Sequence, residues 1–348
     1  MKKIIIAIFA IALFNACQKE VEPIQPISDA STFDTWILNE GGWGNNDAEL
    51  SKLNSQTGKI SNDVFASQNG RGLGDVAQDI IQYGSKLYVT VWNSNTIEVV
   101  DPKTGKSIKQ IPMGQRGPRH LLGHEGKVYV TCYDKTVVRI DTTTLTLDAA
   151  ACTLSGMQPE TLCQLNGKIY VANSWEYQGG NPVYDNTLSV VDLATFREEK
   201  KIQVGTNPTI VAPIDDNHIL LTGQGSDGEN TLMVLDLSAE TMQSLGVKAT
   251  GCDLYQNKCY SYYQNWTTGE TQLQCTNLST METTPISLAE AHLTSPYGIK
   301  VNPTTGNILI TDALDYMSNG DVACITPTGK LLWKSETSVG PSKIVFVK

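Results

Sequence analysis

A strand–turn–strand unit that recurs along the chain is the feature that most limits how this sequence can fold. The stretch Tyr88–Lys106, YVTVWNSNTIEVVDPKTGK, shows one unit: two runs that alternate apolar and polar residues, a short connection WNSN, and a turn containing Pro and Gly. Such strand ends recur about every 45 residues, a period that predicts an all-β fold, a seven-bladed β-propeller with four strands per blade. Their marker residues are Asn54, Asp101, Asp141, Asp192, Asp236, Asn277 and Thr326.

The two ends of the chain predict how the ring closes. The C-terminal GPSKIVFVK reads as a lone inner strand, whereas the first unit, TWILNEGGWGNNDAELSKLN, lacks an inner strand. We therefore expect Lys343–Val347 to pair into the N-terminal blade, because closure leaves no open sheet edge. The propeller is predicted to occupy residues 36–348.

The N-terminus has the features of an exported lipoprotein. Lys2 and Lys3 precede the apolar run Ile4–Phe14, which is too short for a stable membrane span, and Ala16 lies just before Cys17. Residues 1–16 resemble a bacterial lipoprotein signal peptide, which implies that Cys17 is acylated. The alternative is ordinary cleavage after Ala16 without lipid.

The residues after this cysteine predict where the protein is held. Residues 17–35 are predicted to be the lipidated N-terminus and a flexible tether, since they are polar, hold two prolines and lack periodicity. The acidic residues of CQKEVE resemble the surface-export signal of Bacteroidetes lipoproteins. We therefore expect an outer-membrane, cell-surface protein that contacts the membrane through its lipid anchor only.

The charge of the chain limits the partners that are expected, and its cysteines indicate which thiols are free. With 26 basic and 36 acidic residues the chain is acidic, so nucleic acid is not expected as a partner. The cysteines beyond Cys17 form no C-x-x-C motif, and most lie in apolar strand patterns, which favours buried free thiols. Cys259 and Cys275, on consecutive strands, are the best candidates for a disulfide.

The aromatic residues gather in connections that are predicted to share one face. If the strands of a blade are named a to d from the axis outward, antiparallel geometry puts the b–c and d–a connections on one face and the a–b and c–d turns on the other. The turns are short and polar, whereas the connections carry four of the six tryptophans. The predicted ligand-binding residues are Trp43, Trp92, Tyr133, Trp175, Tyr177, Trp266, Tyr316, Arg116, Arg119, Glu160 and Tyr297.

Two interpretations of these rings remain open. A single loop tryptophan such as Trp92 is most simply explained by packing against the neighbouring blade. Four of them on one face favour a binding surface, because soluble proteins rarely leave several large apolar rings uncovered without a ligand or partner.

Catalysis is not favoured by the motifs. The four histidines form no H-E-x-x-H motif, and His120, which could face the central channel, is more simply a structural residue. Acidic loop residues lack the spacing of a known calcium loop. We expect no catalytic residues, no metal and no cofactor, and a propeller hydrolase or lactonase is the least favoured alternative.

Almost all of residues 36–348 resemble a known kind of propeller. Its Pro-marked inner strands followed by motifs such as HEGKVYV and LNGKIYV resemble the YVTN-type repeat. The segments LNEGGWGNNDAELSKLN and GLGDVAQDIIQYGSKLYVTVWNSNTIEVVD are similar to YncE-type surface-layer lipoproteins of Bacteroidetes, among them BtuG-type cobalamin-binding proteins. The resemblance implies a protein that captures cobalamin (vitamin B12) or a related corrinoid and delivers it to a TonB-dependent outer-membrane transporter. The alternative is a propeller that binds another protein or a glycan.

Overall fold

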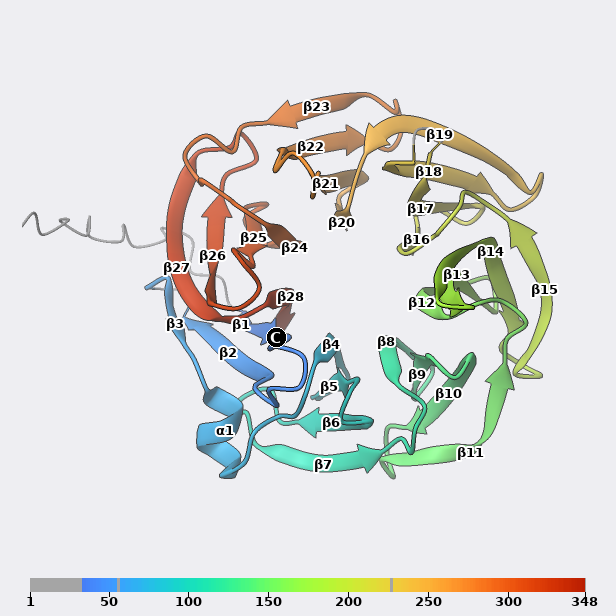
Figure 1. Ribbon diagram of the computed structural model, residues 1–348, viewed down its shortest axis with the longest axis horizontal. Coiled ribbons are helices and arrows are strands. Elements are labelled where there is room, and N and C mark those ends of the chain that lie inside the picture. Colours follow the sequence, from blue (N-terminus) through green and yellow to red (C-terminus); the bar gives the residue numbers. More distant parts are fainter. Residues whose placement is uncertain (1–32, 55–56, 226–227, 348) are drawn as a thin grey trace, which may run out of the picture.

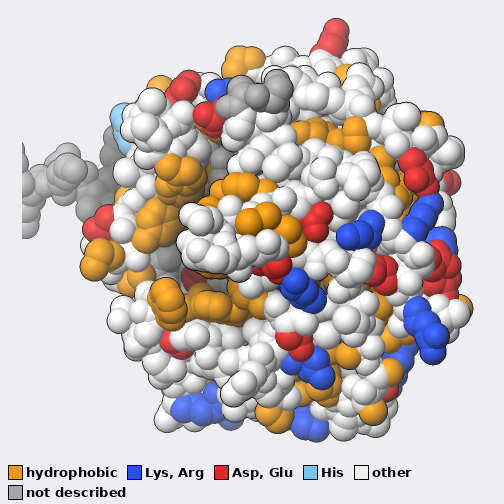
Figure 2. Space-filling view, turned by 45° about the vertical axis from the view of Figure 1, so that its right-hand side comes forward, with side chains coloured by type: hydrophobic (Ala, Val, Ile, Leu, Met, Phe, Trp, Pro, Cys, Tyr) orange, Lys and Arg blue, Asp and Glu red, His pale blue; other side chains and the backbone are white. Residues whose placement is uncertain are grey.

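The computed structural model describes residues 33–54, 57–225 and 228–347. The predicted signal peptide, Cys17 and nearly all of the predicted tether lie outside these residues. Within them, seven four-stranded antiparallel sheets stand around a common axis, so the predicted seven-bladed β-propeller is confirmed (Figure 1). Hydrophobic side chains gather beside a hollow on the side of the molecule seen in Figure 2.

The blades are numbered from the N-terminus, with their strands given from the axis outward. Blade 1 contains β28 (Pro341–Val347), β1 (Asp34–Asn39), β2 (Glu49–Asn54) and β3 (Lys59–Ser61). Blade 2 contains β4 (Ala77–Tyr83), β5 (Lys86–Val91), β6 (Thr96–Val100) and β7 (Ser107–Pro112). Blade 3 contains β8 (Pro118–His124), β9 (Lys127–Cys132), β10 (Thr136–Asp141) and β11 (Thr146–Thr153). Blade 4 contains β12 (Pro159–Leu165), β13 (Lys168–Gln178), β14 (Asn181–Asp192) and β15 (Arg197–Gln203).

The remaining three blades follow the same plan. Blade 5 contains β16 (Val211–Pro213), β17 (His218–Gln224), β18 (Asn230–Asp236) and β19 (Thr241–Lys248). Blade 6 contains β20 (Gly251–Tyr255), β21 (Lys258–Gln264), β22 (Thr271–Asn277) and β23 (Thr283–Ile286). Blade 7 contains β24 (Pro296–Val301), β25 (Ile308–Asp312), β26 (Asn319–Ile325) and β27 (Leu331–Val339). A short helix, α1 (Val64–Asn69), lies between β3 and β4.

The ring closes as the sequence predicts. β28 pairs antiparallel with β1, with Ile344 opposite Ile37 and Val347 opposite Asp34. Strand β28 thus supplies the inner strand that the N-terminal unit lacks. Figure 1 shows the C-terminal strand beside the first strand of the chain, near the axis.

The polar marker residues end their strands by capping the following turn. The Oδ1 atom of Asp141 accepts hydrogen bonds from the backbone N–H groups of Thr143 and Thr144, both at 2.9 Å, and Asn277 does the same for Ser279 and Thr280. Such local bonds favour turns over longer strands. The marker therefore recurs because each blade needs the same turn.

The predicted disulfide between Cys259 and Cys275 is wrong. The strand register puts Cys259 opposite Thr276 and Cys275 opposite Tyr260, so the two cysteines are one position out of register. Because alternate residues point to opposite sides of a sheet, their side chains cannot meet. All seven cysteines in the described part of the chain are free thiols, and five are buried, as expected for most of them.

Candidate ligand-binding face

The connections that were predicted to share one face do so. At blades 2, 3 and 7 the b–c connection is tied to the d–a connection beside it by a backbone hydrogen bond: Trp92 N–H to Val76 at 2.8 Å, Tyr133 N–H to Gly117 at 2.9 Å and Ala313 N–H to Ser295 at 2.9 Å. We call this side the connection face. The opposite side, formed by the a–b and c–d turns, is called the turn face.

A first row of aromatic rings crosses blades 1 to 3 on the connection face. The ring centroids of Trp43 and Trp92 are 6.3 Å apart, and those of Trp92 and Tyr133 are 5.7 Å apart. The guanidinium carbon of Arg119 lies 4.5 Å from the centroid of the Tyr133 ring, a cation–π contact. Trp43 is 78% exposed, whereas Trp92 and Tyr133 are half-buried.

Trp92 therefore fits both interpretations of its position: it packs against neighbouring blades, and it forms part of an exposed aromatic surface. Its ring lies between a ring of blade 1 and a ring of blade 3, so it packs across two blade junctions. The remaining part of the ring is open to solvent. A short Ser- or Asp-containing turn would cap the strands equally well, but it would not connect these loops.

A second aromatic row crosses blades 6 and 7. The rings of Trp266 and Tyr316 are 5.7 Å apart, and those of Tyr316 and Tyr297 are 5.2 Å apart and nearly perpendicular. Trp266 is 61% exposed. The Tyr297 hydroxyl donates a hydrogen bond to the Glu40 carboxylate at 2.6 Å, so this row ends on a charged group.

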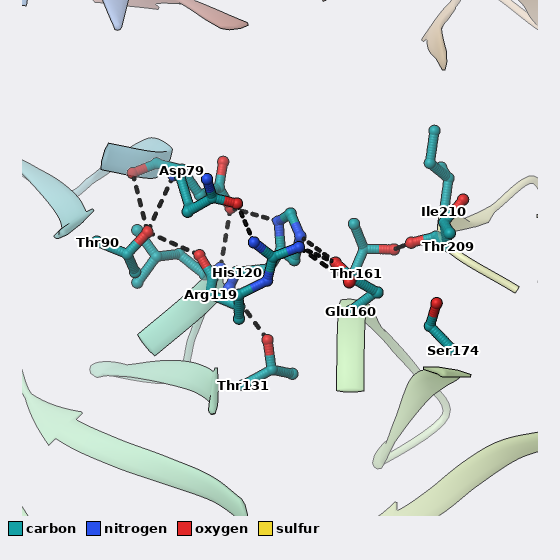
Figure 3. A network of polar contacts seen from close by, with 12 residues as sticks. Asp79, Thr90, Arg119, His120, Thr131, Glu160, Thr161, Ser174, Thr209 and Ile210 are labelled. Carbon is teal, nitrogen blue, oxygen red and sulfur yellow. Dashed lines mark hydrogen bonds and ion pairs between the residues drawn. The ribbon is translucent and has the colours of Figure 1, made fainter. Parts of the chain in front are cut away.

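A buried polar network joins the two rows, and Figure 3 shows its part around Arg119, His120 and Glu160. Arg119 donates from Nη2 to both oxygens of Glu160, at 2.6 and 2.9 Å, and from Nη1 to the side-chain oxygen of Gln78. The Gln78 amide in turn donates to Glu40. The path from Trp43 to Trp266 is thus an unbroken series of ring contacts and hydrogen bonds across five blades.

His120 extends this network along the inner strands. Its Nε2 atom lies 3.0 Å from the Glu160 carboxylate, and its Nδ1 atom lies 3.5 Å from Asp79. The same Asp79 oxygen accepts the Leu121 backbone N–H at 2.9 Å. The imidazole thus bridges three blades, a structural role that accounts for it without catalysis.

The network holds its charges by mutual pairing. Burial disfavours the charged form of Glu160, but Arg119 and His120 outweigh it and lower the pKa of this carboxyl to about 2. Burial raises the pKa of Glu40 above its usual value, because Tyr297 and the more distant Arg119 compensate only in part. Burial also raises the pKa of Tyr133 to about 12, so its hydroxyl stays protonated. The network between the rows is thus polar, and its groups are hydrogen-bonded to one another.

Three predicted site residues lie apart from the two rows. Trp175 and Tyr177 pack on each other, with centroids 4.9 Å apart, on the long β13–β14 hairpin, and Tyr177 is 68% exposed. Glu176, between them, pairs with Lys135 of blade 3 at 2.5 Å. Arg116 forms an ion pair with Asp134 at 2.7 Å, both about one-third exposed.

The sequence predicted Arg119 and Glu160 as site residues, but not Gln78 or Glu40. Gln78, Arg119 and Glu160 are equivalent residues of three successive inner strands, in the motifs AQD, PRH and PET. Gln78 was overlooked because its motif lacks the Pro that marks the other two. Glu40 has no repeat equivalent, and only the fold places it beside Gln78 and Tyr297.

A space near the axis adjoins this network. Inner strands β4, β20, β24 and β28 enclose a cavity of about 340 Å³, and Asp79, Tyr297 and Lys343 are among its lining residues. Among the described residues no group of His, Cys, Asp and Glu is arranged to hold a metal ion. None of their helices is long and apolar enough to cross a membrane.

Comparison with known proteins places the chain in a family. A family model described as a domain of unknown function, DUF5074, matches residues 34–322. The chain belongs to this family. A search of curated proteins finds no match.

Solved structures share the fold of this DUF5074 protein at low sequence identity. A quinoprotein alcohol dehydrogenase-like protein from Bacteroides thetaiotaomicron has a TM-score of 0.66 and 18% identity, over 91% of this chain and 78% of that one. The WD40 propeller domain of Doa1 has a TM-score of 0.60 and 12% identity, over 81% and 86% of the two chains. These likenesses extend to the fold alone.

Proposed function

We propose that this DUF5074 propeller binds cobalamin or a related corrinoid on its connection face and delivers it to a TonB-dependent outer-membrane transporter. The observation that carries the proposal is the pair of aromatic rows, Trp43–Trp92–Tyr133 and Trp266–Tyr316–Tyr297, on either side of one polar network. The sequence resemblance to BtuG-type proteins supports the identity of the ligand.

The chemistry of a corrinoid suits such a surface. A corrin is a broad, flat ring system rimmed by amide groups, so it offers both apolar faces and hydrogen-bonding edges. Exposed rings such as Trp43 and Trp266 provide large apolar contact area at low cost in side-chain entropy. Because the charges of the network are paired, they attract a strongly charged ligand less than free charges would, and they suit an uncharged polar one.

The proposed function also requires the protein to lie at the outer membrane. Acylation of Cys17 would hold the propeller at the outer membrane, where TonB-dependent transporters lie. Replacing Cys17 by Ala is expected to release the protein from the membrane fraction. A variant that stays in that fraction would contradict the anchor without bearing on ligand binding.

Calorimetric titration of the purified protein with cyanocobalamin tests the proposal. We expect saturable binding with one site per chain, weakened about fivefold or more by Trp266→Ala, because interface hot spots are enriched in aromatic residues. Ile108→Ala is the matched control, since Ile108 is also an exposed apolar residue, 46% accessible, but lies on the outermost strand of blade 2.

Two results would overturn the proposal. One is the absence of binding to the folded wild-type protein, which would leave the aromatic rows to another protein or a glycan. The other is equal loss of affinity in Trp266→Ala and Ile108→Ala, which would show that the contact is not made on the connection face.

A further inference from the structure

The junction between blades 5 and 6 differs from the other blade junctions in its core. Seven clusters of buried apolar residues fill the junctions in the described part of the chain, and six of them contain a Trp, Tyr or Phe. The seventh, built around Leu220, Leu232 and Leu278, contains none. One junction therefore lacks the bulky ring that fills the others.

A departure from the repeat explains the missing ring. Strands β5, β9, β13 and β21 begin with the pattern Lys-x-Tyr, and each of these tyrosines belongs to a junction cluster. Strand β17 begins instead with His218-Ile-Leu220. Blade 7 also has a leucine here, Leu309, but Trp333 packs in the same cluster. No such substitute occurs beside Leu220 among the described residues.

Strand β17 also lacks the lysine that begins the Lys-x-Tyr pattern, since His218 stands in its place. In blades 3 and 4, Lys127 and Lys168 lie opposite the marker residues Asp141 and Asp192 and form ion pairs with them at 2.8 and 3.8 Å. In blade 5, His218 lies opposite the marker Asp236, with Nε2 3.8 Å from its carboxylate. An imidazole does not carry the permanent charge of a lysine. Asp236 therefore lacks the fixed cationic partner that Asp141 and Asp192 have.

The altered strand borders a pocket on the turn face, because His218 lines the pocket and Leu220 packs in the cluster of Val234 and Leu278, which also line it. A cavity of about 380 Å³ lies there, a volume within the range of small-ligand sites. Its apolar lining comes from Ile214, Val234, Met242, Leu278 and Met281, and its rim carries Asp215, Asp236 and His218. No lysine or arginine belongs to this lining. The pocket thus joins an aliphatic interior to an acidic rim.

Both rim carboxylates stay ionised, but only Asp236 keeps an oxygen for a ligand, because both oxygens of Asp215 lie 2.9 Å from His218 Nδ1. Hydrogen bonds from the Ala239 N–H and from Asn217 hold the pKa of Asp236 below its usual value, and they involve its Oδ1 atom. Burial disfavours the charge of Asp215, but bonds from Asn217 and His218 lower its pKa overall. The Oδ2 atom of Asp236 has only the 3.8 Å contact with His218 among the described residues.

We propose that the pocket between blades 5 and 6 binds an aliphatic primary amine, with the alkyl chain among the Leu and Met side chains and the ammonium group at Asp236. The ammonium takes the place that lysine holds in blades 3 and 4, and the alkyl chain lies against Val234 and Leu278, in the junction that lacks the tyrosine ring. No Phe, Tyr or Trp ring lines the pocket, which disfavours a quaternary ammonium ligand of the cation–π type. This site is separate from the connection face and does not depend on the proposed corrinoid function.

The test is titration of methyl-labelled methionine protein with n-hexylamine, observed by NMR. We expect saturable shifts at the methyl groups of Met242 and Met281, and no shift at Met113, which is buried in another junction. Asp236→Asn should weaken binding about threefold to tenfold by removing the charge. This variant is expected to fold, because Asn54 and Asn277 are natural asparagines at the marker position. Asp192→Asn, the same change one blade away, is the matched control and should leave binding unchanged.

A second variant tests the shape of the site. Leu220→Tyr restores the residue found at this position in blades 2, 3, 4 and 6, so the added ring should press on Val234 and Leu278, narrow the cavity that they line, weaken the hexylamine shifts and leave the protein folded. Three results would overturn the proposal: no shift at Met242 or Met281 in the wild-type protein, equal affinity for n-hexylamine and the uncharged n-hexanol, or unchanged amine binding in both Asp236→Asn and Leu220→Tyr.

Discussion

The two faces of the propeller are built on different principles. On the turn face, most blades use the same short turn capped by an Asp, Asn or Thr marker, as the bonds to Asp101, Asp141 and Asn277 show. On the connection face, the links between strands differ in length and composition from blade to blade. The β13–β14 hairpin extends far beyond its neighbours, while the link between β9 and β10 is a three-residue turn that carries Tyr133.

This difference separates residues that serve the fold from residues that are free to serve a ligand. A residue that recurs in several blades at one position is explained by the blade itself. Trp43, Glu40 and Trp266 recur nowhere, so the blade does not require them. The same reasoning applies where a recurring residue is missing. In blade 5 Leu220 stands where four other blades have a tyrosine, and the otherwise regular turn face has a pocket beside this junction.

Removal of the closing strand should have the largest effect, because both faces depend on a closed ring. Deleting residues 340–348 removes the inner strand of blade 1, with the buried side chains of Ile344 and Val347. We expect a loss of at least about 4 kcal/mol in the free energy of unfolding, measured by urea denaturation. Deleting Lys348 alone is the control and should change little. A deletion variant as stable as the full chain would contradict ring closure by β28.

Breaking the ion pair in the network should have the next largest effect. Arg119→Met leaves Glu160 buried without its main cationic partner, which is expected to cost about 3–5 kcal/mol in unfolding free energy. Arg116→Met, in the same blade, removes the more exposed pair with Asp134 and should cost less than about 1 kcal/mol. Equal costs would show that the network does not support the connection face.

Acid should weaken the same network. The pKa of Glu160 falls from its ordinary 4.5 to about 2 on folding, so its contribution to stability is complete above pH 4.5 and is lost as the pH falls towards 2. The difference corresponds to about 3 kcal/mol. Unfolding free energies between pH 6 and pH 3 should therefore fall more steeply for the wild-type protein than for Glu160→Gln. Parallel curves would contradict this assignment.

Trp92→Ala tests the one residue that is expected both to pack between blades and to bind the ligand. The ring is half-buried between two neighbours, so we expect a loss of about 1–2 kcal/mol in stability, below the 3–5 kcal/mol typical of a fully buried aromatic residue. The free energy of cobalamin binding, per folded molecule, should become less favourable by about 1–3 kcal/mol. A loss of stability with unchanged affinity would falsify the binding role of Trp92.

The smallest effect is expected on the turn face. Asp141→Asn keeps the cap to Thr143 and Thr144 but removes the ion pair with Lys127, and should lower the melting temperature by no more than about 2 °C. Asp141→Ala removes the cap as well and should lower it further. If the two variants melt alike, the cap is not what fixes the turn.

The repeat made the fold and the face predictable, but not the detail of the site. Period, marker residues and the two complementary chain ends determine seven blades and their closure, and antiparallel geometry assigns each connection to a face. The contact between Tyr297 and Glu40 joins residues at opposite ends of the sequence, and no local pattern encodes it. The disulfide prediction failed because it depended on register, where a shift of one residue reverses the side of the sheet.

The point at which the chain enters the ring has a consequence for orientation. Asp34 lies opposite Val347 at the turn face, and β1 runs from there to Asn39 and Glu40 at the connection face. The chain thus enters the disc on the side opposite the aromatic rows. If Cys17 is acylated as proposed, the segment before Asp34 would join the membrane to the turn face, and the connection face would be the side left open to the medium. The proposed transfer to a transporter in the same membrane would then require the disc to turn over.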